Sequence, residues 1–475
     1  MSILDYFPYD KPREGQRQTL LEVERNIDKY DVFVIDAPVA SGKSGVAVCI
    51  QRWLNAQAKS TTVVTNNNIL RDQYLDDFDS MITVKAQTEY WLEKHDMTVK
   101  EFKQKIYKYG PKGNQYDKDR KDVTKSCSDS VVNSFTYMAH RLQRHCVIFD
   151  EAHTLLPYLR GLHARRLWTD EHQFPHDART PADLLIWLNG IEDKNPLQER
   201  LKTSIETLAE STIFEFAREN YRGDPRDCLK IIPLDVSEEP PVLWPAKVKK
   251  VVLLSATIGP ADIKAMGLGL RRVKYIKTPS PIPYDRRPVK FCDTVNMSMR
   301  FQDDSVPKLA EAIKELASLN AGRGFVHATY SVAKKLREYL SDDPRFIFHT
   351  RSNKRVKFEQ WCSSDPDMYQ IFIGSGMTEG IDLSHDTARW QVLTKVPYPS
   401  LMSPAFRYLA KENPELYAWE TSKEILQASG RICRGPNDYG VTYCLDSSFR
   451  VWYDKASETL PDWFQVENYY NAREL

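Results

Sequence analysis

Residues 32–44 read VFVIDAPVASGKS, an apolar run that passes directly into a Gly-Lys-Ser turn. A short apolar run of this kind is typical of a fully buried parallel strand. In the turn, backbone N–H groups and a lysine can surround the β- and γ-phosphates of a nucleotide, while a hydroxyl contacts Mg²⁺. The stretch therefore predicts a phosphate loop with the binding residues Ala40, Ser41, Gly42, Lys43 and Ser44, the last being also a Mg²⁺ contact.

A second motif of the same kind occurs at residues 146–153, CVIFDEAH. Its apolar run again predicts a buried strand, and the strand ends in two carboxylates. We expect Asp150 to hold Mg²⁺ through water and Glu151 to orient or deprotonate the attacking water. Together, the two motifs predict nucleoside triphosphate hydrolysis. For the first loop alone, a surface turn with a solvated lysine is the alternative.

Three further motifs follow along the chain: SAT at 255–257, GMTEGID at 376–382 and QASGRICR at 427–434. This ordered set resembles superfamily 2 helicases. The stretches IFIGSGMTEGIDLSHD, VPYPSLMSP and QASGRICRGPNDYG resemble the XPD/DinG branch in particular. The resemblance implies an α/β fold with two RecA-like motor domains of parallel sheet. It also implies an ATP-dependent DNA helicase or translocase that uses Mg²⁺ and moves 5′ to 3′ on single strands.

The resemblance also assigns residues to the nucleotide site. Arg431 and Arg434, expected on one face of a helix, would reach the γ-phosphate from the second lobe, where such arginines contribute ~10³ to 10⁵ in rate. A solvated basic helix is the alternative. The other expected members are Gln427 and His153 in the catalytic cleft, Arg13 and Gln16 beside the adenine, and Glu379, Gly380 and Asp382 of the second lobe. Surface polar residues at a helix start would look like Arg13 and Gln16.

Nucleic-acid contacts are expected from polar turns that follow strands, because short polar side chains and free N–H groups bind phosphates without reading sequence. The residues concerned are Thr65, Asn66, Arg71, Thr329, Tyr330 and Ser375. Ordinary strand-exit turns are the alternative.

The alternation of strands and helices is interrupted twice in the first lobe. We expect motor domain 1 at 1–90, 129–155 and 229–279, a basic insertion at 91–128, a mainly helical, arch-like insertion at 156–228, and motor domain 2 at 280–475. Helices are predicted at 17–30, 46–56, 182–191 and 201–221, and strands at 61–65 and 129–137.

The basic insertion departs from the family pattern. Many relatives carry four cysteines there, whereas this segment holds only Cys127, so no iron–sulfur cluster is expected. Instead, lysines and tyrosines could neutralise phosphates and stack on bases. These candidates are Lys103, Lys105, Tyr107, Lys108 and Tyr109, with Phe102 and Tyr116 interleaved. A flexible charged loop is the alternative.

Composition adds modest constraints. The chain has 475 residues, a net charge of +1 and eight cysteines without a CxxC pair. A reduced, cytoplasmic protein without a membrane segment is expected, associated with the nucleoid if bacterial or phage. We expect a monomer whose partners are single-stranded DNA and junctions of single- and double-stranded DNA. An RNA helicase on the same fold and an ATP-switched binding module without unwinding are the alternatives.

Overall fold

The computed structural model describes residues 1–105, 113–140, 142–172, 181–207, 212–221, 224–237, 248–377, 381–435 and 437–469. The chain divides into two compact units, which are described separately. Unit 1 comprises Met1–Asp36, Lys43–Lys277 and Ser400–Leu416, and unit 2 comprises Ala37–Gly42, Thr278–Pro399 and Tyr417–Leu475. The segment 400–416, which contains α15 (Pro404–Glu412), thus groups with unit 1 although its sequence neighbours belong to unit 2.

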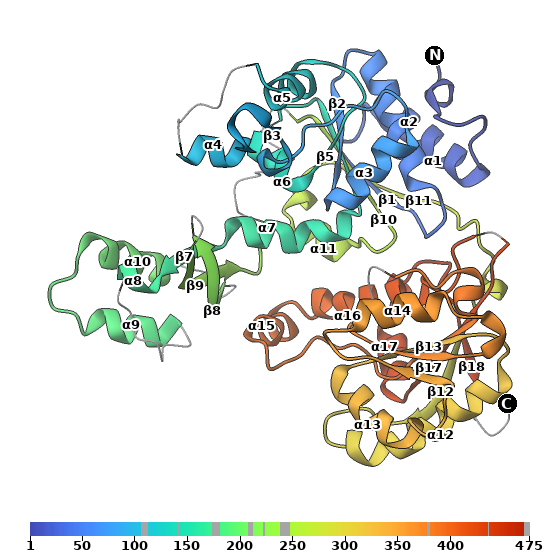
Figure 1. Cartoon of the computed structure of the whole chain (residues 1–475). Coiled ribbons are helices and arrows are strands. Elements are labelled where there is room, and N and C mark those ends of the chain that lie inside the picture. The colour runs from blue at the N-terminus through green and yellow to red at the C-terminus, as the bar shows by residue number, and fades with distance from the viewer. Residues whose placement is uncertain are drawn as a thin grey trace. The chain divides into compact units, whose positions relative to one another are not determined.

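Unit 1 is built on a sheet of six parallel strands in the order β11-β1-β10-β6-β2-β5 (Figure 1). The strands are β1 (Val32–Asp36), β2 (Thr61–Thr65), β5 (Val131–Asn133), β6 (Cys146–Asp150), β10 (Lys250–Ser255) and β11 (Val273–Lys277). Every residue of β6 and β10 is buried, as continuous apolar runs predict for a parallel sheet. The α/β class and the strands expected before both nucleotide motifs are confirmed.

The helices of this motor domain are α1 (Glu14–Asn26), α2 (Lys43–Ala56), α3 (Asn68–Asp77), α6 (Ser134–His140), α7 (Leu155–His163) and α11 (Pro260–Ala265). The helices predicted at 17–30 and 46–56 correspond to α1 and α2. The strand predicted at 129–137 is wrong in its second half, because β5 ends at Asn133 and α6 follows. The side-chain oxygen Oδ1 of Asn133 accepts a hydrogen bond from the N–H of Thr136 at 2.7 Å, which caps the helix start.

The first insertion contains two short antiparallel strands, β3 (Trp91–Leu92) and β4 (Met97–Thr98), and two helices, α4 (Val99–Lys105) and α5 (Gln115–Lys125). Phe102 and Tyr116 are 5% and 1% exposed, so these two rings belong to its core and not to a base-stacking surface. Burial of large aromatic rings supplies the apolar packing that a small charged segment needs to stay folded.

The second insertion contains helices together with a small antiparallel sheet. Its helices are α8 (Thr169–His172), α9 (Pro181–Asn189) and α10 (Pro196–Thr207). They accompany an antiparallel sheet of β7 (Arg165–Trp168), β9 (Asp224–Pro233) and β8 (Thr212–Tyr221), which lies where a helix to residue 221 was predicted. Residues 212–216, TIFEF, are β-branched or aromatic at four of five positions, and pairing with β9 outweighs the weak helical periodicity.

Unit 2 contains seven parallel strands in the order β14-β15-β13-β16-β17-β12-β18. They are β12 (Val289–Val295), β13 (Gly324–Ala328), β14 (Phe346–Phe348), β15 (Ile371–Ser375), β16 (Trp390–Leu393), β17 (Val441–Asp446) and β18 (Val466–Tyr469). The helices are α12 (Gln302–Leu319), α13 (Tyr330–Leu340), α14 (Lys354–Cys362), α16 (Pro414–Ser429) and α17 (Ser448–Ala456). None of the helices in the described ranges is long and apolar enough to cross a bilayer.

Candidate nucleotide site and nucleic-acid surface

The nucleotide motifs of unit 1 meet at one edge of its sheet. Strands β1, β10, β6 and β2 are consecutive neighbours and run parallel, so their carboxyl ends lie side by side. Lys43 follows β1, Ser255 ends β10, Asp150 ends β6 and Thr65 ends β2. This edge is where open parallel sheets bind their ligands.

A chain of polar contacts joins three of these motifs. The Lys43 ammonium lies 3.1 Å from Glu151 Oε1, and Glu151 Oε2 lies 3.3 Å from His153 Nδ1. The same nitrogen of His153 is 3.0 Å from the Ser255 hydroxyl. The structure therefore brings together the expected residues Lys43, Glu151 and His153. It adds Ser255, which lies in the SAT motif but was not predicted as a site residue.

Asp150 is buried beside this chain, with 4% of its surface exposed. Its Oδ2 accepts a hydrogen bond from the Tyr74 hydroxyl at 2.8 Å, and its Oδ1 accepts one from the N–H of Glu151 at 2.9 Å. Burial and the Glu151 carboxylate raise the pKa of Asp150 to about 6, whereas Lys43 and Tyr74 lower it. Perturbation of this kind is common at functional sites, where charged groups are held close together.

The residues expected to hold Mg²⁺ fit that ion. The Asp150 carboxylate hydrogen-bonds to the Tyr74 hydroxyl, and the Ser44 hydroxyl lies beside it, so two oxygen groups from different elements are held around one atom. Oxygen ligands are the ones Mg²⁺ prefers. Sequence reasoning missed Tyr74, since nothing in the residues around it marks a tyrosine of α3 as a neighbour of β6.

The backbone of the phosphate loop bends as its sequence suggested. Gly42 has φ +76°, and Ala40, which stands where glycine is usual, has φ +64°. This left-handed conformation costs a residue with a side chain about 1–2 kcal/mol. The backbone at Ala40 is therefore slightly strained. Ser41 is 5% exposed in the same loop.

Arg13 and Gln16 lie at the start of α1. The Arg13 N–H donates to Gln16 Oε1 at 2.9 Å, and Gln16 is 4% exposed. A Cβ atom placed on Gly45 would lie 3.6 Å from Gln16 Nε2. The structure thus brings the side chain of Gln16 against the helix that begins with Lys43.

In unit 2, Arg431 and Arg434 are not on one face of a helix, because α16 ends at Ser429. The predicted helix at these two residues is therefore wrong, but their side chains still lie next to each other. The guanidinium groups of Arg431 and Arg434 donate to the carbonyl oxygen of Ile381 at 3.0 and 3.3 Å, and Arg434 Nε lies 3.5 Å from Asp382 Oδ1. Gln427 lies on the last turn of α16. Glu379 and Gly380 fall outside the described residues.

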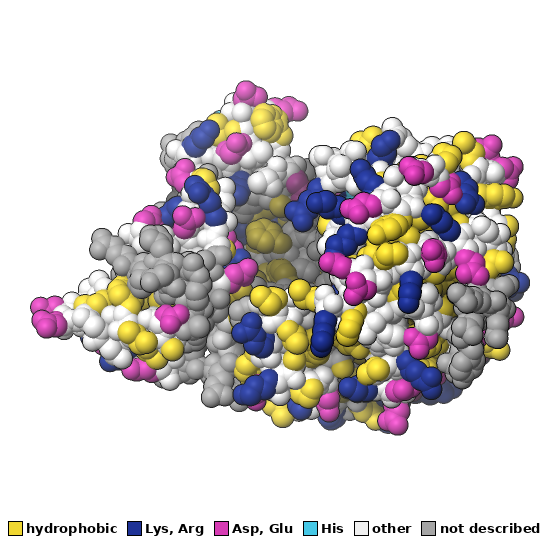
Figure 2. Space-filling model, turned by 90° about the horizontal axis from the view of Figure 1, so that it is seen from below, with side chains coloured by type: hydrophobic (Ala, Val, Ile, Leu, Met, Phe, Trp, Pro, Cys, Tyr) yellow, Lys and Arg dark blue, Asp and Glu magenta, His cyan; other side chains and the backbone are white. Residues whose placement is uncertain are grey.

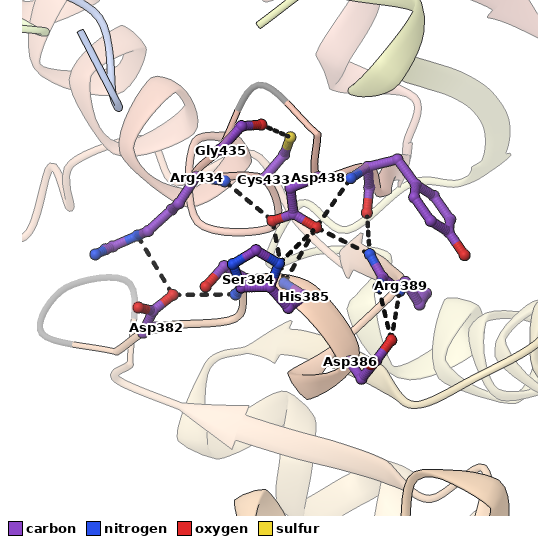
Figure 3. A network of polar contacts seen from close by, with 10 residues as sticks. Asp382, Ser384, His385, Asp386, Arg389, Cys433, Arg434, Gly435 and Asp438 are labelled. Atoms are coloured by element: carbon purple, nitrogen blue, oxygen red, sulfur yellow. Dashed lines mark hydrogen bonds and ion pairs between the residues drawn. The ribbon is translucent and has the colours of Figure 1, made fainter.

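A buried carboxylate organises the turn that follows these arginines (Figure 3). Asp438 is 1% exposed and accepts hydrogen bonds from the N–H groups of His385 at 3.0 Å and Arg434 at 3.2 Å. The Arg389 guanidinium donates to it at 2.9 Å. Asp438 therefore ties the segment after Asp382 to the segment that carries Arg434. Sequence reasoning missed it, although it lies inside the GRICRGPNDYG stretch.

The nucleic-acid candidates of unit 1 differ in accessibility. Arg71 is fully buried, and its guanidinium donates to Glu89 at 2.9 and 3.2 Å. The prediction that Arg71 contacts a phosphate backbone is therefore wrong. Thr65 is also fully buried, and its hydroxyl donates to the carbonyl of Asn67 at 2.9 Å. Asn66, in contrast, is exposed in the turn between β2 and α3.

The candidates of unit 2 lie around two adjacent strand ends, since β13 and β15 are neighbours. The Thr329 hydroxyl caps α13 by accepting from the N–H of Val332 at 3.3 Å. The Tyr330 ring lies under the Arg351 guanidinium at 4.8 Å. Ser375 is 2% exposed, and its N–H donates to His349 Nε2 at 3.0 Å.

In the basic insertion, the Lys103 ammonium lies 4.8 Å over the buried Tyr116 ring, whereas Lys105 is exposed. Tyr107, Lys108 and Tyr109 lie outside the described residues. Cys127 is exposed, and within the described ranges no group of three or more His, Cys, Asp or Glu side chains is arranged to hold a metal ion. Figure 2 shows lysine and arginine side chains interspersed with acidic and apolar ones on the face it presents.

Known proteins match both halves of the chain. Residues 313–467 match the helicase C-terminal domain family, and residues 10–158 match the family described as type III restriction enzyme, res subunit. The ATP-dependent DNA helicase YoaA of Escherichia coli (strain K12) is 23% identical over 234 residues, which are 46% of this chain and 36% of that protein. A regulator of telomere elongation helicase 1 homolog of Drosophila ananassae is 33% identical over 87 residues, 16% of this chain and 9% of that protein.

The matches thus span about a third or less of the length of these curated relatives. Among solved structures, S. tokodaii Xpd4 superposes with a TM-score of 0.60 at 15% identity and covers 96% of this chain and 100% of its own. A structure described as XPD helicase gives a TM-score of 0.60 at 16% identity, covering 97% of this chain and 100% of that one. These two likenesses agree on the fold. The ordered motifs and the two family matches support an XPD/DinG-type superfamily 2 helicase, and these structures are similar to the chain in fold.

Proposed function

We propose that this protein is an ATP-dependent DNA helicase or translocase that moves 5′ to 3′ along single-stranded DNA. The observation that carries the proposal is the convergence of Lys43, Ser255 and the Asp150–Glu151 pair at neighbouring ends of one parallel sheet. The name of the E. coli relative, an ATP-dependent DNA helicase, supports the choice of DNA.

In the proposed mechanism, Lys43 binds the β- and γ-phosphates, and the N–H groups of the loop before it complete the cradle. Ser44 and Asp150 would hold Mg²⁺, which neutralises charge on the phosphate oxygens when bound. Glu151, whose side chain is 31% exposed, orients the attacking water and accepts its proton on the carboxylate. His153 contacts both Glu151 and Ser255, so it connects the water-orienting group to the end of β10.

Gln16, with Arg13, is proposed to read the adenine, since an amide can donate to a ring nitrogen and accept from an exocyclic amine. Arg431 and Arg434 are proposed to stabilise charge on the γ-phosphate. Their shared contact with the Ile381 carbonyl supports the idea that they act together. Gln427 and Asp382, in the same part of unit 2, belong to this proposed group.

The DNA is proposed to contact polar groups at strand ends, among them the exposed Asn66 in unit 1 and, in unit 2, the exposed Thr329 and the half-buried Tyr330. Lys105 and Lys108 of the basic insertion would add phosphate contacts. Single-stranded DNA and its junctions with duplex are the proposed partners of a monomeric enzyme. A cytosolic location is part of the proposal, because all eight cysteines are free thiols and reducing compartments keep them so.

One experiment tests the central proposal. Duplexes with a 5′ overhang, a 3′ overhang or blunt ends are offered to the protein with ATP and Mg²⁺, and strand separation is followed. We expect unwinding of the 5′-tailed duplex only. Preference for a 3′ tail would overturn the polarity, and ATP hydrolysis stimulated by single-stranded RNA but not DNA would overturn the substrate. Tight ATP-dependent binding without turnover would indicate a binding module.

A further inference from the structure

Tyr74 of α3 contacts both groups that are proposed to hold Mg²⁺. Its hydroxyl donates to Asp150 Oδ2 at 2.8 Å and lies beside the Ser44 hydroxyl. Ser44 lies in the first turn of α2 and Asp150 at the end of β6, so one hydroxyl links two elements that are far apart in sequence. All three residues belong to unit 1.

Packing holds the Tyr74 ring in place. The side chain is 1% exposed, and its ring lies 5.6 Å from the ring of Phe78, the residue that follows the end of α3. The Phe78 ring in turn lies 5.8 Å from that of Tyr9. Because buried aromatic rings in such clusters have little rotational freedom, the position of the hydroxyl is set by the core of the unit.

The direction of the hydrogen bond between Tyr74 and Asp150 follows from the proton count. A tyrosine hydroxyl has one proton and two acceptor lone pairs, and an ionised carboxylate only accepts. Tyr74 therefore gives its proton to Asp150 and presents its free lone pairs to the neighbouring Ser44 hydroxyl. A Ser44 hydroxyl that turns its proton toward those lone pairs keeps its own lone pairs available for a cation. The second lone pairs of the Asp150 oxygens are likewise available.

We propose that Tyr74 is a positioning residue of the Mg²⁺-nucleotide site, which orients the Ser44 hydroxyl and the Asp150 carboxylate so that their remaining lone pairs hold the ion. The inference rests on the proposed function. It adds a residue outside the recognisable motifs on which metal affinity depends. Groups that hydrogen-bond to metal-holding side chains typically change metal affinity by ~10- to 100-fold when they are removed.

The test compares wild type with Tyr74→Phe, which keeps the ring and removes the hydroxyl. Mn²⁺ affinity is measured by electron paramagnetic resonance at saturating ADP, so that no turnover is required. We expect the dissociation constant of Mn²⁺ to rise ~10-fold or more. Tyr116→Phe is the matched control, since Tyr116 is equally buried and its hydroxyl bonds to Gln87 at 2.9 Å, away from the site. The control should bind Mn²⁺ like wild type.

A double-mutant cycle with Ser44→Ala shows whether Tyr74 acts through its partners. The effects of substitutions at neighbouring, interacting residues are not additive. Tyr74→Phe should therefore weaken Mn²⁺ binding less in the Ser44→Ala background than in wild type. Unchanged Mn²⁺ affinity in Tyr74→Phe, or full additivity in the cycle, would overturn the inference and leave the proposed function intact. A wild-type protein that binds no Mn²⁺·ADP would instead refute the proposed function and this inference together.

Discussion

The ammonium group of Lys43 faces the carboxylate of Glu151 at 3.1 Å, so the cation that follows β1 is paired with the anion that follows β6. The two residues have different proposed tasks, one in binding phosphate and one in positioning water. Loss of the Lys43 charge should therefore impair nucleotide binding, whereas loss of the Glu151 charge should impair hydrolysis. Variants of the two residues should separate these two steps.

Lys43→Ala should abolish ATP hydrolysis, because in the described structure it is the lysine that pairs with Glu151 at the phosphate loop. Removal of one such electrostatic contact typically costs ~10²- to 10³-fold in turnover. The measurement is steady-state ATP hydrolysis with saturating single-stranded DNA. Turnover within about tenfold of wild type would contradict the assignment of Lys43.

Glu151→Gln should bind ATP but fail to hydrolyse it, since the amide keeps the shape of the carboxylate and loses its basicity. We expect a loss on the order of 10²-fold or more in turnover. Equilibrium binding of a fluorescent ATP analogue, measured alongside turnover, separates the two effects. Glu22→Gln on α1, whose carboxylate pairs with Lys274 at 2.6 Å, is the matched control and should turn over normally. Normal turnover in Glu151→Gln would remove Glu151 from the catalytic role.

Asp438→Asn should destabilise the turn that carries Arg434. The amide has no negative charge to face Arg389 and offers an N–H group where backbone N–H groups already point. Hydrogen bonds to charged groups contribute about 1.5–3 kcal/mol, so we expect a lower melting temperature and weaker hydrolysis. Asp386→Asn is the control, because Asp386 also pairs with Arg389 but its side chain is 72% exposed. This change should have little effect on melting temperature or hydrolysis. Equal effects of the two changes would argue against an organising role for Asp438.

The basic insertion is expected to contribute phosphate contacts through Lys105 and Lys108. Replacing both with alanine should weaken binding of single-stranded DNA and reduce its log–log salt slope by about 0.7 per contact. Hydrolysis without DNA should not change. Lys308→Ala on α12, an exposed lysine of unit 2, is the control for charge. Lys103→Ala should act differently and lower stability, because Lys103 lies over the buried Tyr116 ring. If the variant without Lys105 and Lys108 binds single-stranded DNA with an unchanged salt slope, these two lysines belong to a solvated surface.

The purified protein should be colourless and iron-free, and its helicase activity should survive an iron chelator. The reason is the single cysteine, Cys127, in a segment where a cluster needs about four thiolates. Iron determination and a visible absorption spectrum are the measurements. Iron at about one cluster per chain would show that distant cysteines converge.

Much of unit 1 could be predicted from local patterns. Continuous apolar runs at 32–35, 146–149 and 251–254 became buried parallel strands, because a strand covered on both faces needs no polar alternation. Polar residues that follow such strands meet at one sheet edge whatever their distance in sequence. The meeting of Lys43 with Glu151 and His153 was therefore predictable from motif order and fold class.

Tertiary structure alone decided what local patterns leave open. Residues 212–221 form a strand because β9 offers a pairing partner, and the periodicity of the segment carries no information about that partner. Arg71 resembled a surface contact until its burial against Glu89 was known, since burial depends on which elements pack over a residue. Tyr74 and Asp438 act through hydrogen bonds to residues far from them in sequence. Strand formation follows from short-range apolar patterning, whereas burial and long-range hydrogen bonding are properties of the packed fold.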